Sequence, residues 1–223
     1  MTKVICLLLT LHVLFNVSYA QVNCDGKGTV AGIVVRSDGK PVQGAQVGVL
    51  TQDCVSVGVS PQATSMTDGT FELLNVPVVA SDVYAWKTEE QYPDARFAIY
   101  ANQAPAPRIM VTKGRVTTNV VVHLGAKAAS ISGVALDSDS LSPIFAARVV
   151  LQRVGDERIM YSTNVGRNGE FNILVPPSGT KFMVTAPGYQ PWIYPATDGQ
   201  SAGEVKTEAG KQIDIVAKLN RAK

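Results

Sequence analysis

The sequence predicts an all-β protein, built from two tandem seven-stranded antiparallel β-sandwich domains after a signal peptide. Short apolar runs and period-two alternation recur along the chain, and no window holds a convincing 3.6-residue apolar period. A second observation is a repeated pattern of an opening strand that begins with glycine, an apolar strand and a Gly-x-Phe strand. The equivalent landmarks lie 101, 102 and 100 residues apart, at Gly32 and Gly133, Val47 and Val149, and Phe71 and Phe171. This period suits whole small domains and is too long for a solenoid repeat.

The first 20 residues have the pattern of a secretory signal. Lys3 is followed by an apolar run over 4–17 and by Ser-Tyr-Ala, so we expect cleavage after Ala20. A membrane anchor needs about 18 to 25 apolar residues, and this run is shorter and interrupted by polar side chains. No small residue precedes Cys24, so lipidation is not expected. The protein is therefore expected to be secreted or periplasmic, in a bacterial envelope or secretome, without membrane insertion after cleavage.

Cysteine usage fits an oxidising compartment. Loss of Cys6 with the signal leaves Cys24 and Cys54, which we expect to form a disulfide. The bridge would close a 31-residue loop and stabilise the fold by about 3.5 kcal/mol in the loop-entropy model. The mature chain keeps one histidine, His123, in an alternating valine-rich strand, so a Cys-and-His zinc site is excluded. We expect no metal and no cofactor.

The charge of the mature chain argues against polyanionic partners. Without Lys3 the chain has 19 basic and 18 acidic residues, a net charge of +1, and no dense basic block. Nucleic acid and an anionic membrane surface are therefore not expected as partners.

The expected strands are rich in β-branched residues and end at Gly, Pro, Asp or Ser. In the first half they contain Val30, Ile33 and Val35, Val47 and Val49, Val55 and Val57, and Phe71 and Leu73, followed by 97–100, 109–111 and 116–124. In the second half they cover 131–136, 149–153, 159–163, 171–174, 182–185 and 213–219.

Three turns explain why particular glycines recur. Asp38-Gly39, Asp68-Gly69 and Asn168-Gly169 are pairs that tolerate the positive φ of a tight hairpin. The short small-residue segment 125–128 marks the boundary between the domains. We therefore expect a signal peptide over 1–20, a first domain over 21–125 and a second over 126–223.

These residues resemble the carboxypeptidase regulatory-like family, whose domains are seven-stranded prealbumin-like (transthyretin-like) sandwiches. The stretch 38–47, Asp-Gly-x-Pro-Val-x-Gly-Ala-x-Val, and the stretch 67–71 carry the resemblance in the first copy. In the second copy it rests on Gly188-Tyr189 and on Ala209-Gly210. The loop 137–147 departs from the pattern, because a Ser-rich segment replaces the Asp-Gly turn. The resemblance implies a fold and no particular chemistry.

The residue patterns of enzymes are missing from the mature sequence. The transthyretin-like fold includes a hydrolase that depends on several histidines and a C-terminal Tyr-Arg-Gly-Ser, and neither occurs. No Gly-x-Ser-x-Gly elbow accompanies His123, and the exposed pair Glu89-Glu90 is expected to be a solvated patch. We therefore predict a non-catalytic binding or spacer module, with a hydrolase as a remote alternative.

The closest alternative is a carbohydrate-binding module that uses exposed aromatic side chains. Its candidate ligand-binding residues are Tyr189, Trp192 and Tyr194, which follow the Gly188 turn, together with Trp86. The expected partner is then an envelope or extracellular protein or a glycan. Two weaker possibilities are a calcium site at Asp68 or at Asp137 and Asp139, and an intramolecular crosslink through Lys27 or Lys113.

Overall fold

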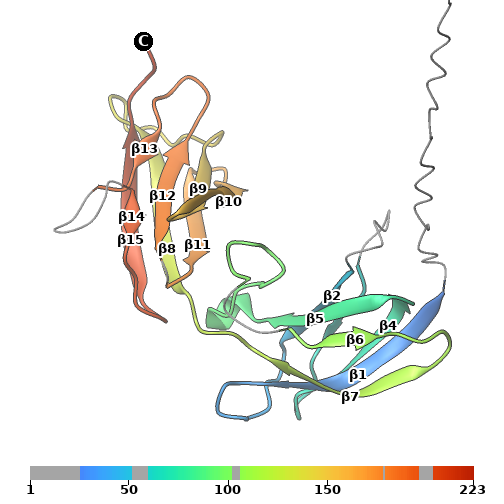
Figure 1. The fold of residues 1–223 in the computed structure, drawn as a ribbon. Coiled ribbons are helices and arrows are strands. Elements are labelled where there is room, and N and C mark those ends of the chain that lie inside the picture. The colour runs from blue at the N-terminus through green and yellow to red at the C-terminus, as the bar shows by residue number, and fades with distance from the viewer. Residues whose placement is uncertain (1–25, 52–59, 102–105, 178, 196–202) are drawn as a thin grey trace, which may run out of the picture.

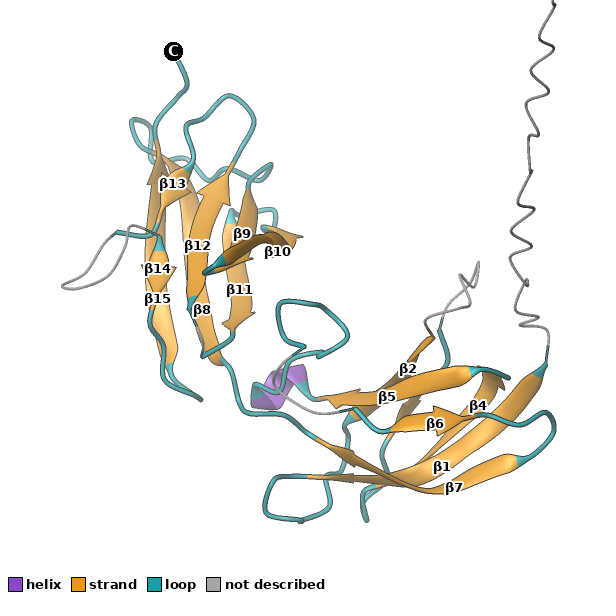
Figure 2. Ribbon diagram, viewed as in Figure 1, coloured by secondary structure: helices purple, strands orange, loops and turns teal. Residues whose placement is uncertain are grey.

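The computed structural model describes residues 26–51, 60–101, 106–177, 179–195 and 203–223. Figures 1 and 2 show two β-sandwiches, the N-terminal one in blue to yellow-green and the C-terminal one in yellow to red, joined by one short crossing segment. The strands of the two sandwiches run in different directions, so the molecule is bent.

The N-terminal sandwich pairs a three-stranded sheet, in the order β4-β1-β7, with a four-stranded sheet, in the order β3-β2-β5-β6. Its strands are β1 (Lys27–Val35), β2 (Gln46–Thr51), β3 (Gln62–Thr64), β4 (Thr70–Pro77), β5 (Ala80–Trp86), β6 (Arg108–Met110) and β7 (Val116–His123). A short 3-10 helix, η1 (Thr88–Glu90), follows β5.

The C-terminal sandwich has the same arrangement, with sheets in the order β11-β8-β15 and β10-β9-β12-β13, and with β14 also paired to β12. Its strands are β8 (Ala129–Asp137), β9 (Arg148–Arg153), β10 (Asp156–Asn164), β11 (Glu170–Val175), β12 (Thr180–Thr185), β13 (Trp192–Ile193), β14 (Glu204–Val205) and β15 (Gln212–Leu219).

The all-β fold class is confirmed, with two differences: the described C-terminal sandwich has eight strands and not the expected seven, and one pairing in each sandwich is parallel. In each sandwich the last strand returns beside the first and runs parallel to it, β7 beside β1 and β15 beside β8. A parallel pair needs a long connection, and in each sandwich the five or more intervening strands supply it.

Three elements differ from the sequence-based expectation in the first sandwich, one of them the unexpected short strand β3 (Gln62–Thr64). Residues 97–100 were expected to form a strand and form turns instead. Burial alternates regularly along β5, which was not expected as a strand. The small Ser81 and Ala85 lie on its buried face and the aromatic Tyr84 and Trp86 on the other, so its buried face could not be recognised from the sequence. The expected strand at Val55 and Val57 lies outside the described residues.

The repeated glycine and phenylalanine form one packing unit in each sandwich. Gly32 lies opposite Phe71 on the neighbouring strand, and Gly133 lies opposite Phe171. A Cβ on Gly32 would lie 2.9 Å from Phe71 Cζ, and one on Gly133 would lie 2.7 Å from Phe171 Cζ. Both rings are buried, at 3% and 7% exposure. The glycine is needed for two reasons: a Cβ would clash still more closely with the backbone carbonyl of the parallel last strand, at Val120 or Ile215, and the phenylalanine ring lies across the bare backbone.

The turns also behave as expected. Gly39, Gly69 and Gly169 have φ of 79°, 80° and 73°, the left-handed region that favours glycine. The divergent loop after β8 still closes against its strand, because Leu136 bridges Pro143 as Val35 bridges Pro41. Among the described residues, no helix is long and apolar enough to cross a membrane.

Candidate binding cleft at the junction of the two sandwiches

A loop of the N-terminal sandwich is buried in the core of the C-terminal one. Ile99 and Tyr100 are 3% and 4% exposed and belong to the same hydrophobic cluster as Ile131, Leu151 and Phe182. Each large apolar side chain removed from water contributes about 1.5 to 3 kcal/mol. Residues 97–100 were expected as a strand of the first sandwich, but Ile99 and Tyr100 are buried against the neighbouring sandwich.

Polar and aromatic contacts surround this anchor. The Tyr100 hydroxyl donates to the backbone carbonyl oxygen of Leu174 at 2.8 Å, and Arg153 Nη2 donates to the carbonyl of Ala98 at 2.7 Å. The rings of Phe97 and Tyr161 have centroids 5.1 Å apart, and burial raises the pKa of Tyr100. Because Leu174 lies on β11, at the edge of its sheet, the loop also satisfies an outward carbonyl of that edge.

Gln91 fixes the connecting segment. It has a φ of 66°, and its carbonyl oxygen accepts a hydrogen bond from the Ala128 N–H at 2.9 Å. Its side-chain Nε2 donates to Ser130 Oγ at 3.3 Å, and Gly210 N–H donates to the Ala128 carbonyl at 3.0 Å. The crossing segment is thus bonded to both sandwiches.

A cleft of about 800 Å³ opens beside this junction. Side chains from both sandwiches line it: aromatic rings, uncharged polar groups and two carboxylates. The residues are Trp86, Thr88, Glu89, Gln91, Pro93, Asp94, Phe97 and Tyr100 from the first sandwich and Ser130, Tyr161, Thr163, Asn172, Ile173, Leu174 and Gln212 from the second.

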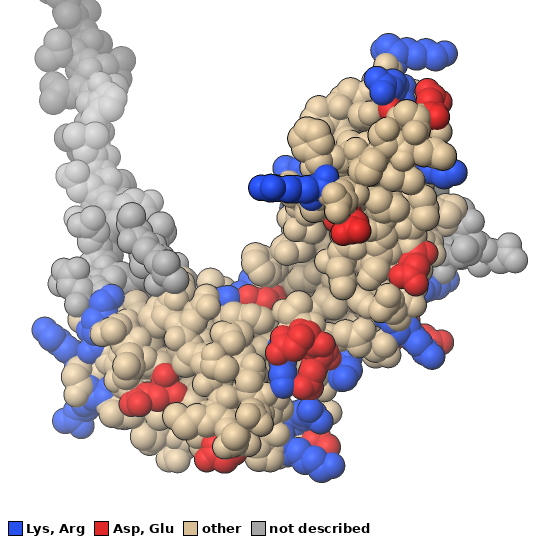
Figure 3. Space-filling model, turned by 180° about the vertical axis from the view of Figure 1, so that it is seen from behind, with Lys and Arg blue, Asp and Glu red and all other residues tan. Residues whose placement is uncertain are grey.

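One carboxylate of the cleft is neutralised internally. Asp94 accepts two hydrogen bonds from Arg96 Nε, at 3.0 and 3.1 Å, and one from Nη2 at 2.7 Å. The same guanidinium lies 4.1 Å from the centroid of the Trp86 ring, a cation–π distance. One face of Trp86 is therefore covered by the protein. On the face shown in Figure 3, basic and acidic residues are scattered without a continuous basic patch.

The structure does not bring the four predicted ligand-binding aromatics together. Trp86 lines the cleft, and in the described part of the chain no ring contact joins it to the other three. Trp192 and Tyr194 pack edge-on against Phe182, with centroids 6.3 and 6.5 Å away, and both rings are half-buried. A role for these residues in binding stays a prediction.

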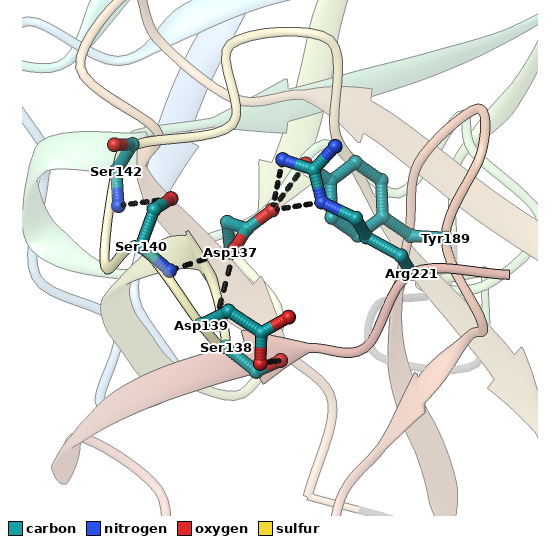
Figure 4. Close-up of polar contacts among 7 residues, drawn as sticks. All are labelled: Asp137, Ser138, Asp139, Ser140, Ser142, Tyr189 and Arg221. Atoms are coloured by element: carbon teal, nitrogen blue, oxygen red, sulfur yellow. Dashed lines mark hydrogen bonds and ion pairs between the residues drawn. The ribbon is translucent and has the colours of Figure 1, made fainter.

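Tyr189 belongs instead to a polar network around a buried carboxylate (Figure 4). Asp137 is 1% exposed, and its Oδ2 accepts from the Tyr189 hydroxyl at 2.8 Å and from Arg221 Nε at 2.9 Å. Its Oδ1 accepts from the N–H groups of Asp139 and Ser140 at 3.0 and 2.9 Å. The bond from the Ser140 N–H, followed by the one from Tyr189, holds the pKa of Asp137 well below its usual range.

This network occupies the oxygens that a calcium ion would need. Asp68 is likewise bonded to the N–H and hydroxyl of Thr70, at 3.0 and 2.6 Å. Across the described residues, no group of three or more His, Cys, Asp or Glu side chains could hold a metal ion. Lys27 and Lys113, the two crosslink candidates, are exposed. Cys24 and Cys54, and the predicted cleavage site, lie outside the described residues.

Sequence reasoning missed most of the cleft. Phe97, Tyr161 and Asn172 were expected as strand residues and not as neighbours, because they come from three separate segments of the chain. Of the four candidate ligand-binding residues, Trp86 alone lines the cleft.

Comparisons with known proteins add little beyond the fold. No family model matches the chain, and no curated protein matches it. Among solved structures, the shaft pilin SpaA of Lactobacillus rhamnosus GG (E269A mutant) is 9% identical with a TM-score of 0.36, covering 89% of this chain and 98% of that one. A streptococcal ancillary pilin is 12% identical with a TM-score of 0.31, covering 90% of this chain and 64% of that one.

Two further likenesses show how unspecific these matches are. The Bacillus anthracis TIE protein is 14% identical with a TM-score of 0.33; the match covers 88% of this chain, which spans about a third (34%) of that one. An enzyme, 3-chlorocatechol 1,2-dioxygenase of Rhodococcus opacus 1CP, is 10% identical with a TM-score of 0.33, covering 44% of this chain and 62% of that one. At such values neither function nor assembly transfers to this chain.

Proposed function

We propose that this chain is an exported, non-catalytic spacer module that holds two sandwich domains in a fixed, bent arrangement. In this proposal residues 1–20 are a signal peptide, and 21–125 and 126–223 are two domains of the carboxypeptidase regulatory-like type. The repeated Gly–Phe packing unit supports the tandem assignment, because both copies use the same strand positions.

The insertion of Ile99 and Tyr100 into the C-terminal core is the observation that carries the spacer role. Domains of one chain move relative to each other by default unless a hydrophobic interface holds them, and the buried Ile99 and Tyr100 supply apolar contact of that kind. The junction also buries hydrogen bonds from Tyr100 and Gln91, which give it a defined geometry. A fixed separation and angle are what a spacer must supply.

A catalytic role has little support among the described residues. His123 is exposed on β7 and makes no hydrogen bond to a nucleophile or carboxylate in the described part of the chain. The strongly perturbed carboxylate, Asp137, has both oxygens occupied by the protein, so it lacks access to a substrate.

Rotational tumbling of the secreted chain tests the proposal. Backbone ¹⁵N relaxation should give both sandwiches the same correlation time, that of the whole molecule. The double variant Ile99→Ala with Tyr100→Ala should give two shorter times, while Phe145→Ala, which changes a 74% exposed ring away from the junction, should leave the single time unchanged. Independent tumbling of the two sandwiches in the unmodified protein would refute the spacer role. The N-terminal residue of the secreted material, expected at Gln21, tests export.

A further inference from the structure

The junction cleft contains unpartnered polar groups beside exposed aromatic surface. Phe97 is 48% exposed and stands against Tyr161. Among the described residues, the side chains of Thr88, Thr163 and Asn172 have no hydrogen-bond partner in the protein, although all three line the cleft. These groups come from η1, β10 and β11, so the cleft exists only while the two sandwiches are held together.

We propose that this cleft binds a short neutral oligosaccharide, stacked on Phe97 and hydrogen-bonded by Thr163 and Asn172. A sugar ring has an apolar C–H face and a rim of hydroxyls. An aromatic ring suits the face. Hydroxyl and amide side chains both donate and accept, as sugar hydroxyls do. The volume of about 800 Å³ lies within the usual range for small-ligand sites, roughly 300 to 1,000 Å³.

Charge selects the neutral class of glycan. No Lys, Arg or His is among the described residues that line the cleft, whereas Glu89 and Asp94 are. A phosphate, sulfate or uronic acid would therefore meet Glu89, which forms no ion pair with a cation among the described residues. Asp94 already accepts three hydrogen bonds from the Arg96 guanidinium and one from the Arg96 N–H, so a cationic ligand gains little from it.

The free polar groups also favour a glycan over a proline-rich peptide. Proline has no N–H, so such a peptide offers mainly backbone carbonyls, which only accept. Thr163 and Asn172 each have both functions available. A sugar hydroxyl uses both at once.

The experiment is a ¹H–¹⁵N NMR titration of the mature chain with neutral tetrasaccharides of glucose, mannose and N-acetylglucosamine. At least one should shift resonances around Phe97, Tyr161 and Asn172 in a saturable way. Phe97→Ala should weaken that binding at least about tenfold. Asn172→Ala should weaken it about fivefold or more, without disturbing the junction, because this exposed side chain has no partner in the described structure.

Matched controls come from the same chain. Phe145→Ala and Asn164→Ala change an exposed phenylalanine and an exposed strand asparagine that do not line the cleft, and both should bind within about twofold of the unmodified protein. The proposal requires the fixed junction, and the relaxation measurement reports that property separately. Independent tumbling of the two sandwiches in the relaxation measurement would overturn the spacer role. The titration of Asn172→Ala tests glycan binding alone.

Three results would overturn the proposal. One is the absence of saturable shifts with every tetrasaccharide at millimolar concentration. Another is binding that survives both cleft substitutions and is lost in Trp192→Ala, which would move the site to the Tyr189–Tyr194 region. The third is saturable binding of a proline-rich peptide in the cleft with none of the sugars.

Discussion

The hydroxyl of Tyr100, in the N-terminal sandwich, donates a 2.8 Å hydrogen bond to the backbone carbonyl of Leu174, at the edge of the C-terminal one. Tyr100 is 4% exposed, and replacing its hydroxyl removes the protein donor to that carbonyl. We expect Tyr100→Phe to lower the free energy of unfolding of the C-terminal sandwich by about 1 to 2 kcal/mol. Urea denaturation, monitored through the NMR resonances of each sandwich, measures this change in the free energy of unfolding.

Tyr194→Phe is the matched control for that prediction. The Tyr194 hydroxyl has no partner among the described residues, and its ring is retained in the variant. Its effect should stay within about 0.5 kcal/mol. Equal losses in the two variants would mean that the Tyr100 bond does not stabilise the junction.

The two buried phenylalanines should be equally indispensable. Phe71 and Phe171 each fill the space above a glycine of the opening strand, and truncation leaves a cavity that this rigid strand cannot close. Phe71→Ala and Phe171→Ala should each cost about 3 to 5 kcal/mol, against little change for Phe145→Ala. Thermal unfolding measures the difference. Unchanged melting temperatures in both core variants would contradict the alignment of the two repeats.

The sequence predicted what local rules control. Gly69 and Gly169 marked their turns because only a residue without Cβ adopts such φ values easily, and the alternation around Phe71 and Phe171 marked buried faces. The parallel return strands were not predictable, because a valine-rich strand such as β7 looks the same beside a parallel or an antiparallel partner.

The cleft escaped prediction for a different reason. Residues 97–100 were expected as a strand of the first sandwich, since a sequence pattern does not report which neighbouring surface Ile99 and Tyr100 pack against. The side chains of Asp137 and Tyr189 are 52 residues apart in the chain and meet only after folding. The presence of an aromatic residue in the sequence therefore does not show whether its side chain is held in a polar network, as Tyr189 is, or exposed, as Phe97 is.

We expect the secreted protein to contain a disulfide between its two remaining cysteines. Cys24 and Cys54 are the two cysteines that remain after cleavage at Ala20, and an exported chain offers them few other partners. Mass spectrometry of secreted protein, alkylated before and after reduction, should find no accessible thiol before reduction and two afterwards. Two alkylated thiols in the unreduced sample would exclude the bridge.

Asp137 should make the C-terminal sandwich sensitive to acid. The Ser140 N–H and the Tyr189 hydroxyl hold its folded pKa below the value of about 3.9 that an unfolded chain has. For a depressed pKa, the stabilisation is complete above the unfolded pKa and is lost as pH falls toward the folded pKa. Asp137→Asn should therefore be less stable than the unmodified protein at neutral pH, and the gap should shrink below about pH 4.

Melting temperatures recorded between about pH 7 and pH 3 test this expectation. Asp139→Asn, an exposed neighbour in the same loop, is the control and should follow the unmodified protein throughout. Other acids, such as Asp68, contribute the same background in every variant, since the hydrogen bonds of Thr70 lower its pKa as well. The narrowing gap is therefore specific to Asp137. A constant gap across the pH range would show that Asp137→Asn acts through shape alone and that the buried charge does not stabilise the fold.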